Sequence, residues 1–430
     1  MCKGDVAMRY MGLAAVALTA ISSAMPSAGL AADANSPVGR CVAARVATVP
    51  GFSGVVLARR GSDVGQIALG TADGAGRAIT ADTRFNLGSA NKMFTAVAVA
   101  QLVEAGKVGL DDPIGRYVAG LTPEASAVTV RQLLTHSSGL GSFFSPDTLD
   151  ALARARSIAD LMPLVSDEKP AFAPGTQFRY SNTGFLLLGA MIERVSGQSY
   201  GGYLRDHVFV PAGMTATGLD PASPVPAAVG MTTMPALPPL GGPGASGPGA
   251  PGMVMIRPGD AGAPMPPPGA PGLLIMRPGE GGGPAAPMAL PEVPPRPALE
   301  SSLPGTPAGS AYSNADDLRR FFAALATGKL VNAKTAAMFI APQIEAPAPP
   351  GGARAHYGFG FGTGSFEGHR WYGHNGGAPG VNVEATLFPD DDVEIEVLAN
   401  RDPPVATRLF GDLRRVLLDP VKLAACAAGG

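Results

Sequence analysis

A serine and a lysine spaced three residues apart are the first candidates for chemistry in this chain. The motif Ser89-Ala90-Asn91-Lys92 opens an apolar segment, residues 93–103, whose spacing predicts a largely buried helix that ends at Gly106. Residues i and i+3 share one face of a helix, so Lys92 would reach the Ser89 hydroxyl. A serine needs a neighbouring base to act as a nucleophile at neutral pH, and a partly desolvated lysine can be that base. The N–H groups at the helix N-terminus would favour developing negative charge.

The same spacing occurs a second time, in Ser166-Asp167-Glu168-Lys169. Pro170 follows directly and disfavours helical geometry at Lys169. The acidic neighbours would keep that lysine protonated. We therefore predict a solvated loop at the second copy and chemistry only at the first.

The triplet Tyr-Ser-Asn also occurs twice, at residues 180–182 and 312–314. The second copy is followed by Asp316 and Asp317, which suit the first turn of a helix, and Ser313 or Asn314 would be its N-cap. No chemistry is required of that copy. The first copy lies between the Ser-x-x-Lys helix and a later His-Asn-Gly triplet, and there we expect it to be functional.

Elements rich in strand signals lie at both ends of the chain, with helices between them. Thr129 and Gln132 form a capping-box pattern at the start of one helix, and Gly197 and Gly328 end two others. This order predicts an α+β fold in which the N- and C-terminal parts share one antiparallel sheet, flanked by helices and accompanied by an all-helical lobe. Strands are expected near 51–61, 66–76, 357–366, 370–377, 381–389 and 393–400, and helices near 92–105, 129–136, 182–196, 314–327 and 405–418.

The chain divides into five predicted segments. Residues 221–304 are dominated by Pro, Gly, Ala and Met and contain a near-repeat that starts at Gly249 and again at Gly269. Such a composition predicts an insertion that packs no core. It is either a tolerated surface loop or a segment that touches a membrane, the cell wall or a partner. The segments are a signal peptide (1–32), the first part of the α/β lobe (33–88), the helical lobe (89–220), the insertion (221–304) and the second part of the α/β lobe (305–430).

The N-terminus has the features of a secretory signal. Lys3 and Arg9 precede a short apolar run, and small residues near Ala31 offer a cleavage site. We predict a periplasmic or secreted protein; the alternative is an uncleaved anchor. Cys41 and Cys426 would remain in the mature chain, either as a disulfide or as free thiols, with Cys426 in a tail that frays.

Composition narrows the classes of partner. The 430 residues carry a net charge of −2, and no basic stripe is present, so nucleic-acid binding is not expected. His369 and His374 do not follow the spacing of a common zinc motif, and His136 is expected to be structural. We predict no metal and no cofactor, and a small molecule or peptide as substrate. The sequence leaves the oligomeric state open.

Six blocks, in order, resemble one family: the serine β-lactamases and penicillin-binding proteins, including class C β-lactamases, D-alanyl-D-alanine carboxypeptidases, D-aminopeptidases and related esterases. The resemblance covers nearly all of the mature chain except the insertion. The blocks are TRFNLGSANKMFTA, GLDDPIGRYV, TVRQLLTHSSGL, PGTQFRYSNTGFLLLGAMIERVSGQSY, VFVPAGMTATG and GHNGGAPGVN.

The resemblance implies a role for each motif. Ser89 would attack the acyl carbon while Lys92 takes its proton, and Tyr180 would pass that proton to the leaving group and later help to activate water. Tyr180 could do so only if its phenol pKa fell from about 10, with Lys92 supplying positive charge. The substrate would be held by Asn182 and by the triplet His374-Asn375-Gly376, and the N–H groups of Ser89 and Gly377 would form the oxyanion hole.

His374 stands where many members of this family have a lysine. A histidine is mostly neutral at neutral pH, which favours esters or D-amino-acid peptides over rapid β-lactam hydrolysis. The resemblance thus implies an exported serine hydrolase that works through an acyl-enzyme. The alternatives are a penicillin-binding sensor that is acylated without turnover, and a scaffold or wall-binding protein built around the insertion.

Overall fold

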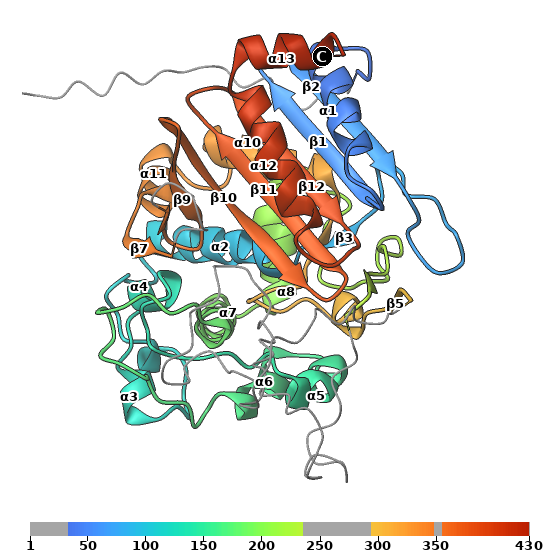
Figure 1. The fold of residues 1–430 in the computed structure, drawn as a ribbon. Helices are drawn as coiled ribbons and strands as arrows, with labels where there is room; N and C mark the ends of the chain where they lie inside the picture. Colours follow the sequence, from blue (N-terminus) through green and yellow to red (C-terminus); the bar gives the residue numbers. More distant parts are fainter. Residues whose placement is uncertain (1–32, 235–293, 348–354, 430) are drawn as a thin grey trace, which may run out of the picture.

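The computed structural model describes residues 33–234, 294–347 and 355–429. Its centre is an eight-stranded antiparallel sheet with the strand order β2-β1-β12-β11-β10-β9-β8-β7. Strand β1 pairs with β12 on one side and with β2 on the other, so the two ends of the described chain build one sheet (Figure 1). The strands are β1 (Gly54–Arg60), β2 (Asp63–Leu69), β7 (Ile344–Ala346), β8 (Ala355–Tyr357), β9 (Gly362–Phe366), β10 (His369–Ala378), β11 (Val381–Phe388) and β12 (Val393–Ala399).

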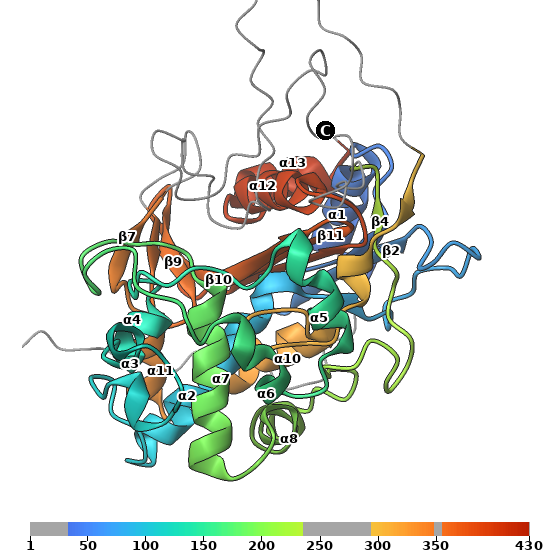
Figure 2. The ribbon, with the colours of Figure 1, turned by 90° about the horizontal axis from the view of Figure 1, so that it is seen from below.

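Helices cover both faces of the sheet (Figures 1 and 2). One face carries α1 (Pro37–Ala47), α12 (Val405–Leu417) and α13 (Pro420–Ala427), and the other carries α2 (Lys92–Glu104), α10 (Ala315–Ala326) and α11 (Ala333–Ile340). Along β11 the buried side chains alternate between the two faces: Val383 and Ala385 pack toward α2, while Phe388 packs toward α12. This layered arrangement confirms the predicted α+β fold.

A group of mostly short helices forms a lobe beneath α2 (Figure 1). The central one, α7, is apolar and packs directly on α2 and α4. It ends at Gly197, whose φ of 72° is a left-handed conformation that glycine adopts without strain. The helices of this part of the chain are α3 (Pro123–Ser126), α4 (Val130–Leu134), α5 (Leu149–Arg154), α6 (Ile158–Leu161), α7 (Asn182–Ser196), α8 (Tyr200–Leu204) and α9 (Val210–Ala212).

Two predicted helix starts are confirmed by their caps. At α4, Thr129 Oγ1 accepts from the Gln132 N–H, and the Gln132 side chain accepts from the Thr129 N–H. At α10, the Asn314 side chain accepts from the Asp317 N–H at 2.8 Å. Local sequence specified both ends because side chains satisfy the free N–H groups of a first turn.

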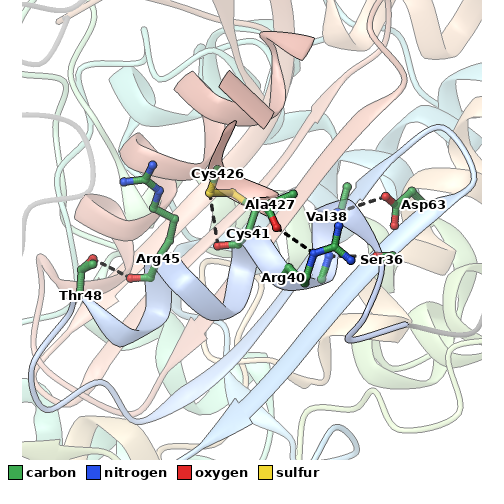
Figure 3. Close-up of a disulfide and its surroundings, with 10 residues drawn as sticks. Ser36, Val38, Arg40, Cys41, Arg45, Thr48, Asp63, Cys426 and Ala427 are labelled. Carbon is green, nitrogen blue, oxygen red and sulfur yellow. Dashed lines mark hydrogen bonds between the residues drawn. A yellow bond between two sulfur atoms is a disulfide. The ribbon is translucent and has the colours of Figure 1, made fainter. Parts of the chain in front are cut away.

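The C-terminal end of the described chain is more ordered than the sequence predicted. Cys426 lies in α13 and is buried, not in a frayed tail, and it forms a disulfide with Cys41 of α1 (Figure 3). The Arg40 side chain adds a hydrogen bond to the Ala427 carbonyl at 2.8 Å. The open choice between a disulfide and free thiols is therefore decided by the packing of α13 on α1.

Both margins of the predicted insertion belong to the fold. β4 (Met231–Thr232) pairs with β5 (Arg296–Pro297), and the buried Arg84 guanidinium donates to the carbonyls of Asp220 and Val225. The prediction that the whole segment 221–304 packs no core is wrong at these margins. The near-repeats at Gly249 and Gly269, like the predicted signal peptide, lie outside the described residues.

Two predictions remain, on the limits of the five segments and on a membrane anchor. The five segment limits stay predictions, although the strands of the eight-stranded sheet do come from the two expected parts of the chain. Within residues 33–234, 294–347 and 355–429, no helix is both long and apolar enough to cross a bilayer.

Candidate active site

A tight turn aligns Ser89 with Lys92. The chain leaves β3 (Phe85–Asn86), passes through the 3₁₀ turn η1 (Gly88–Asn91) and enters α2 at Lys92. Side chains three residues apart are eclipsed in a 3₁₀ turn, so the two groups face each other more directly than in an α-helix. Lys92 Nζ lies 3.3 Å from Ser89 Oγ. The structure thus brings the predicted nucleophile and base together.

The Lys92 amine is removed from water. Its side chain is fully buried, and this burial holds the pKa of the amine well below its usual range. Nζ also lies 2.8 Å from Asn182 Oδ1 and within hydrogen-bond distance of the Ala308 carbonyl oxygen. Both of these oxygens can only accept. A neutral amine that donates its two hydrogens to them keeps a lone pair for the hydroxyl proton of Ser89.

Asn182 is fixed from two sides. It is the first residue of α7, after Ser181, whose side chain caps that helix by accepting from Gly184 N–H at 2.9 Å. Asn182 Nδ2 donates to Ser142 Oγ at 2.8 Å, which leaves Oδ1 directed to Lys92. Ser142 was not predicted from the sequence, since no motif separates it from the serines around it.

Tyr180 lies beside the same amine. Lys92 Nζ is 4.7 Å from the centre of the Tyr180 ring. The ring is partly exposed, but the hydroxyl oxygen is buried and, among the described residues, makes no hydrogen bond of normal geometry. Burial raises the pKa of this phenol, and the nearby Ser89 hydroxyl only partly offsets the rise. The prediction that Lys92 lowers the phenol pKa is therefore wrong: the amine lies over the ring and is itself desolvated.

The His136 ring packs against the Tyr180 ring. The two rings lie 4.1 Å apart, and His136 Nδ1 accepts from the Ser181 N–H at 3.0 Å. Burial, together with Lys92 and His374, holds the pKa of His136 well below its usual range. His136 has a φ of 57°, which is uncommon for a residue other than glycine. The sequence predicted a structural histidine but gave no sign that it would contact the candidate site.

Strand β10 closes the other side of the site. Gly376 passes so close to η1 that a Cβ on it would lie 2.0 Å from Leu87 O and 3.0 Å from Ser89 N. The Gly377 nitrogen is next to Gly88, at 3.0 Å from the position of a Cβ there. Two glycines therefore let the backbones of β10 and η1 touch. The structure brings the Ser89 and Gly377 backbones together, and their role as an oxyanion hole stays a prediction.

His374 and Asn375 lie on opposite faces of β10. The His374 ring is buried and near Tyr180, with 6.4 Å between ring centres. Asn375 pairs with Glu384, whose side chain accepts from Thr407 on α12, so the Asn375 side chain shares the face covered by that helix. Its carbonyl, in contrast, accepts from His374 Nδ1. Substrate binding by these two residues stays a prediction, and His374 is the one placed toward Ser89.

A tyrosine that no sequence motif marked also contacts the residues of the site. Tyr357 on β8 is buried, and its hydroxyl lies 2.8 Å from His374 Nε2. Its ring also contacts His136, at 4.6 Å between centres. No motif marks Tyr357, because its partner lies two strands away in the sheet.

Comparison with known proteins identifies the family of this chain. A family model described as Beta-lactamase matches residues 38–418, which is most of the chain. The chain belongs to the beta-lactamase family. Its curated relatives include Penicillin-binding protein 4* of Bacillus subtilis (strain 168), 35% identical over 39% of this chain and 38% of that protein. Esterase EstB of Burkholderia gladioli is 34% identical over 39% of this chain and 47% of that protein. The chain thus spans less than half the length of each.

Solved structures of this fold match over most of the chain. A penicillin-binding protein from Bacillus halodurans has a TM-score of 0.67 at 24% identity, covering 88% of this chain and 98% of that one. A D-amino acid amidase from Ochrobactrum anthropi SV3 has a TM-score of 0.63 at 21% identity, covering 92% and 99%. At these identities the likeness establishes the shared fold.

The lysine and the tyrosine of the second motif copies have other partners than their counterparts in this site. Lys169 is exposed and forms an ion pair with Glu124 at 3.0 Å. Tyr312 is buried, and its hydroxyl donates to the Leu303 carbonyl at 2.6 Å. Both copies therefore have structural or solvent contacts in place of chemical partners.

Proposed function

We propose that this member of the beta-lactamase family is an exported serine hydrolase that works through an acyl-enzyme. The observation that carries the proposal is the buried Lys92 amine, 3.3 Å from Ser89 Oγ and with a pKa well below its usual range. A neutral amine at neutral pH is the base that a serine nucleophile requires.

The contacts around Lys92 support the following first half of the reaction. Ser89 Oγ attacks the carbonyl carbon of the substrate as its proton passes to Lys92. The oxyanion is stabilised by the N–H groups of Ser89 and Gly377. The Tyr180 phenol, which burial keeps protonated, acts as a relay: its hydroxyl donates to the leaving group as it takes up the proton from Lys92, so that no free phenolate and no lowered pKa is needed. The leaving group departs and an acyl-Ser89 ester remains.

The second half reverses these proton transfers. A water molecule attacks the acyl-Ser89 ester and gives its proton to the Lys92 and Tyr180 pair. Ser89 leaves as the alkoxide and is reprotonated, and the acid product is released. In this proposal Asn182, which is held by Lys92 and Ser142, binds the acyl part of the substrate.

The substrate class is an ester, a D-amino-acid peptide or a β-lactam. Support comes from relatives named as an esterase and as penicillin-binding proteins, and from a fold neighbour that is a D-amino acid amidase. A comparison of a chromogenic cephalosporin, a short-chain p-nitrophenyl ester and D-alanyl-D-alanine peptides would rank these classes by kcat/KM.

Export is supported by two features. The N-terminal segment has a basic start, an apolar run and small residues, as signal peptides do. The disulfide between Cys41 and Cys426 suits an oxidising compartment. Cell fractionation of the tagged full chain, with N-terminal sequencing of the mature protein, tests export and the cleavage site together.

The decisive test of the chemistry is Ser89→Ala. We expect this variant to fold and to lose covalent labelling by a fluorophosphonate or a fluorescent penicillin. Ser166→Ala, in the second Ser-x-x-Lys copy, is the matched control and should label like the wild type. Full labelling of the Ser89 variant would refute the proposal. A wild-type adduct that persists in intact mass spectrometry would instead support the penicillin-binding sensor.

A further inference from the structure

Both nitrogens of the His374 ring are already occupied. Nδ1 lies 2.6 Å from the Asn375 carbonyl oxygen, which can only accept, so Nδ1 carries the hydrogen. Nε2 then accepts from the Tyr357 hydroxyl, 2.8 Å away. A neutral imidazole has one donor and one acceptor, and here the protein uses both. His374 therefore has no free N–H to offer to a ligand.

A charged His374 is also disfavoured. A second ring proton would sit on Nε2 and oppose the Tyr357 O–H. Burial is the main cause that lowers the pKa of His374 to about 3, a Lys92 that became charged would disfavour the imidazolium as well, and the hydrogen bond to the Asn375 backbone only partly offsets this. Within the part of the chain that the structure describes, the ionisable groups that interact with the ring are Lys92, His136, Tyr357 and Tyr180, and none of them is an acid that would be negative at neutral pH.

Among the described residues, the two other basic groups that interact with His374 are Lys92 and His136, and both are held toward their neutral forms. The pKa of His136 is well below its usual range because of burial and of Lys92 and His374. Lys92 is bound to Asn182 and Ala308 and is the proposed base for Ser89. Lys92 can hold a carboxylate only by becoming charged, which would end its function as a base.

We propose that this site accepts substrates whose leaving group is uncharged, and that a carboxylate on the leaving group is penalised. The inference rests on the proposed acyl-enzyme function and names the substrate class of that site: neutral esters, thioesters or amides. A carboxylate placed between Ser89 and β10 would lose its water and meet no cation from Lys92, His136 or His374. We expect a preference of about tenfold or more for the neutral form.

A pair of thioesters with the same N-acetyl-D-alanyl acyl group tests this in the wild-type full chain. One leaving group is thioglycolate, and the other is its uncharged carboxamide. Release of thiol gives kcat/KM for each from about pH 5 to about pH 8. We expect the carboxamide to be favoured at every pH, with a constant ratio. Equal or faster turnover of thioglycolate would overturn the inference, as would a ratio that moves toward thioglycolate as the pH falls through about 6.5.

A substitution at position 374 tests the same preference in a second way, by changing the protein and not the substrate. His374→Lys should reduce the preference for the carboxamide, because it places an amine without the Tyr357 bond at this position. His369→Lys is the matched control on the same strand, far from Ser89 and beside Asp391, and should keep the wild-type ratio. If His374→Lys fails to fold, the wild-type ratio and its pH profile still decide the question.

Fluorophosphonate labelling separates this inference from the function on which it rests. If Ser89 is not labelled and neither thioester is cleaved, the proposed hydrolase function fails, and the inference fails with it. If Ser89 is labelled but thioglycolate is the better substrate, only the preference for uncharged leaving groups is wrong.

Discussion

Replacing Gly376 with alanine should disable the site without unfolding the protein. Gly376 is the residue of β10 that touches η1, and a Cβ on it would lie 2.0 Å from Leu87 O, 2.9 Å from Leu87 C and 3.0 Å from Ser89 N. All three atoms belong to backbone, which cannot rotate away as a side chain does. The strand and the turn that carries the nucleophile must therefore separate.

The size of the effect follows from these distances. Ordinary van der Waals contact begins at 3.4 Å, so the two backbones must part by roughly 1.4 Å along the line to Leu87 O. A displacement of about 1 Å can lower a rate by about 10²-fold, and loss of one oxyanion donor costs about 10² to 10³-fold. Overpacking of this kind costs about 1–3 kcal/mol of stability, less than the about 5–15 kcal/mol by which a typical domain is stable. We therefore expect a folded protein with acylation slowed by about 100-fold or more.

The assay measures the second-order rate of Ser89 labelling by a fluorophosphonate, alongside denaturant unfolding of the same samples. Gly74→Ala is the matched control, because a Cβ at Gly74 meets nothing within 4 Å. That control should label and unfold like the wild type. If Gly376→Ala labels within about threefold of the wild type while remaining folded, the backbone contact is not needed for acylation and our reasoning is wrong.

Three further predictions concern stability and pH. The disulfide between Cys41 and Cys426 spans 385 positions. Serine at both should lower the free energy of unfolding by up to about 5 kcal/mol, and unchanged denaturant midpoints would contradict this. Burial raises the pKa of Glu384 to about 7, so its contribution to stability is present below about pH 4 and lost as the pH rises to 7. Between pH 5 and pH 8, the free energy of unfolding of Glu384→Gln should change by about 3 kcal/mol less than that of the wild type. An equal change in the two proteins would contradict this prediction. The neutral form of Lys92 is the proposed base, so acylation should fall as the pH drops through its lowered pKa. If acylation of Lys92→Ala falls over the same pH range, the group that titrates there is not Lys92.

Part of the site was predictable because its geometry is local. The spacing of Ser89 and Lys92 brings them to one face in any helical turn, and their neighbours were enough to set aside the second Ser-x-x-Lys copy. The second Tyr-Ser-Asn copy was assigned correctly because an N-cap is a property of a few consecutive residues. Ser142 and Tyr357 were missed, since each acts on a partner far away in the sequence and belongs to no motif.

The sequence by itself determined the family, the α+β order of elements, the pairing of Ser89 with Lys92, and most helix ends. These depend on residues close together in the chain or on blocks that keep their order. Only the tertiary structure determined the protonation states of the residues at the site. It buried Lys92 and so lowered the pKa of its amine, raised the phenol pKa of Tyr180 where a fall was predicted, and placed the Tyr357 hydroxyl on His374. A pKa depends on how much water and which charges surround a group, and packing alone sets both.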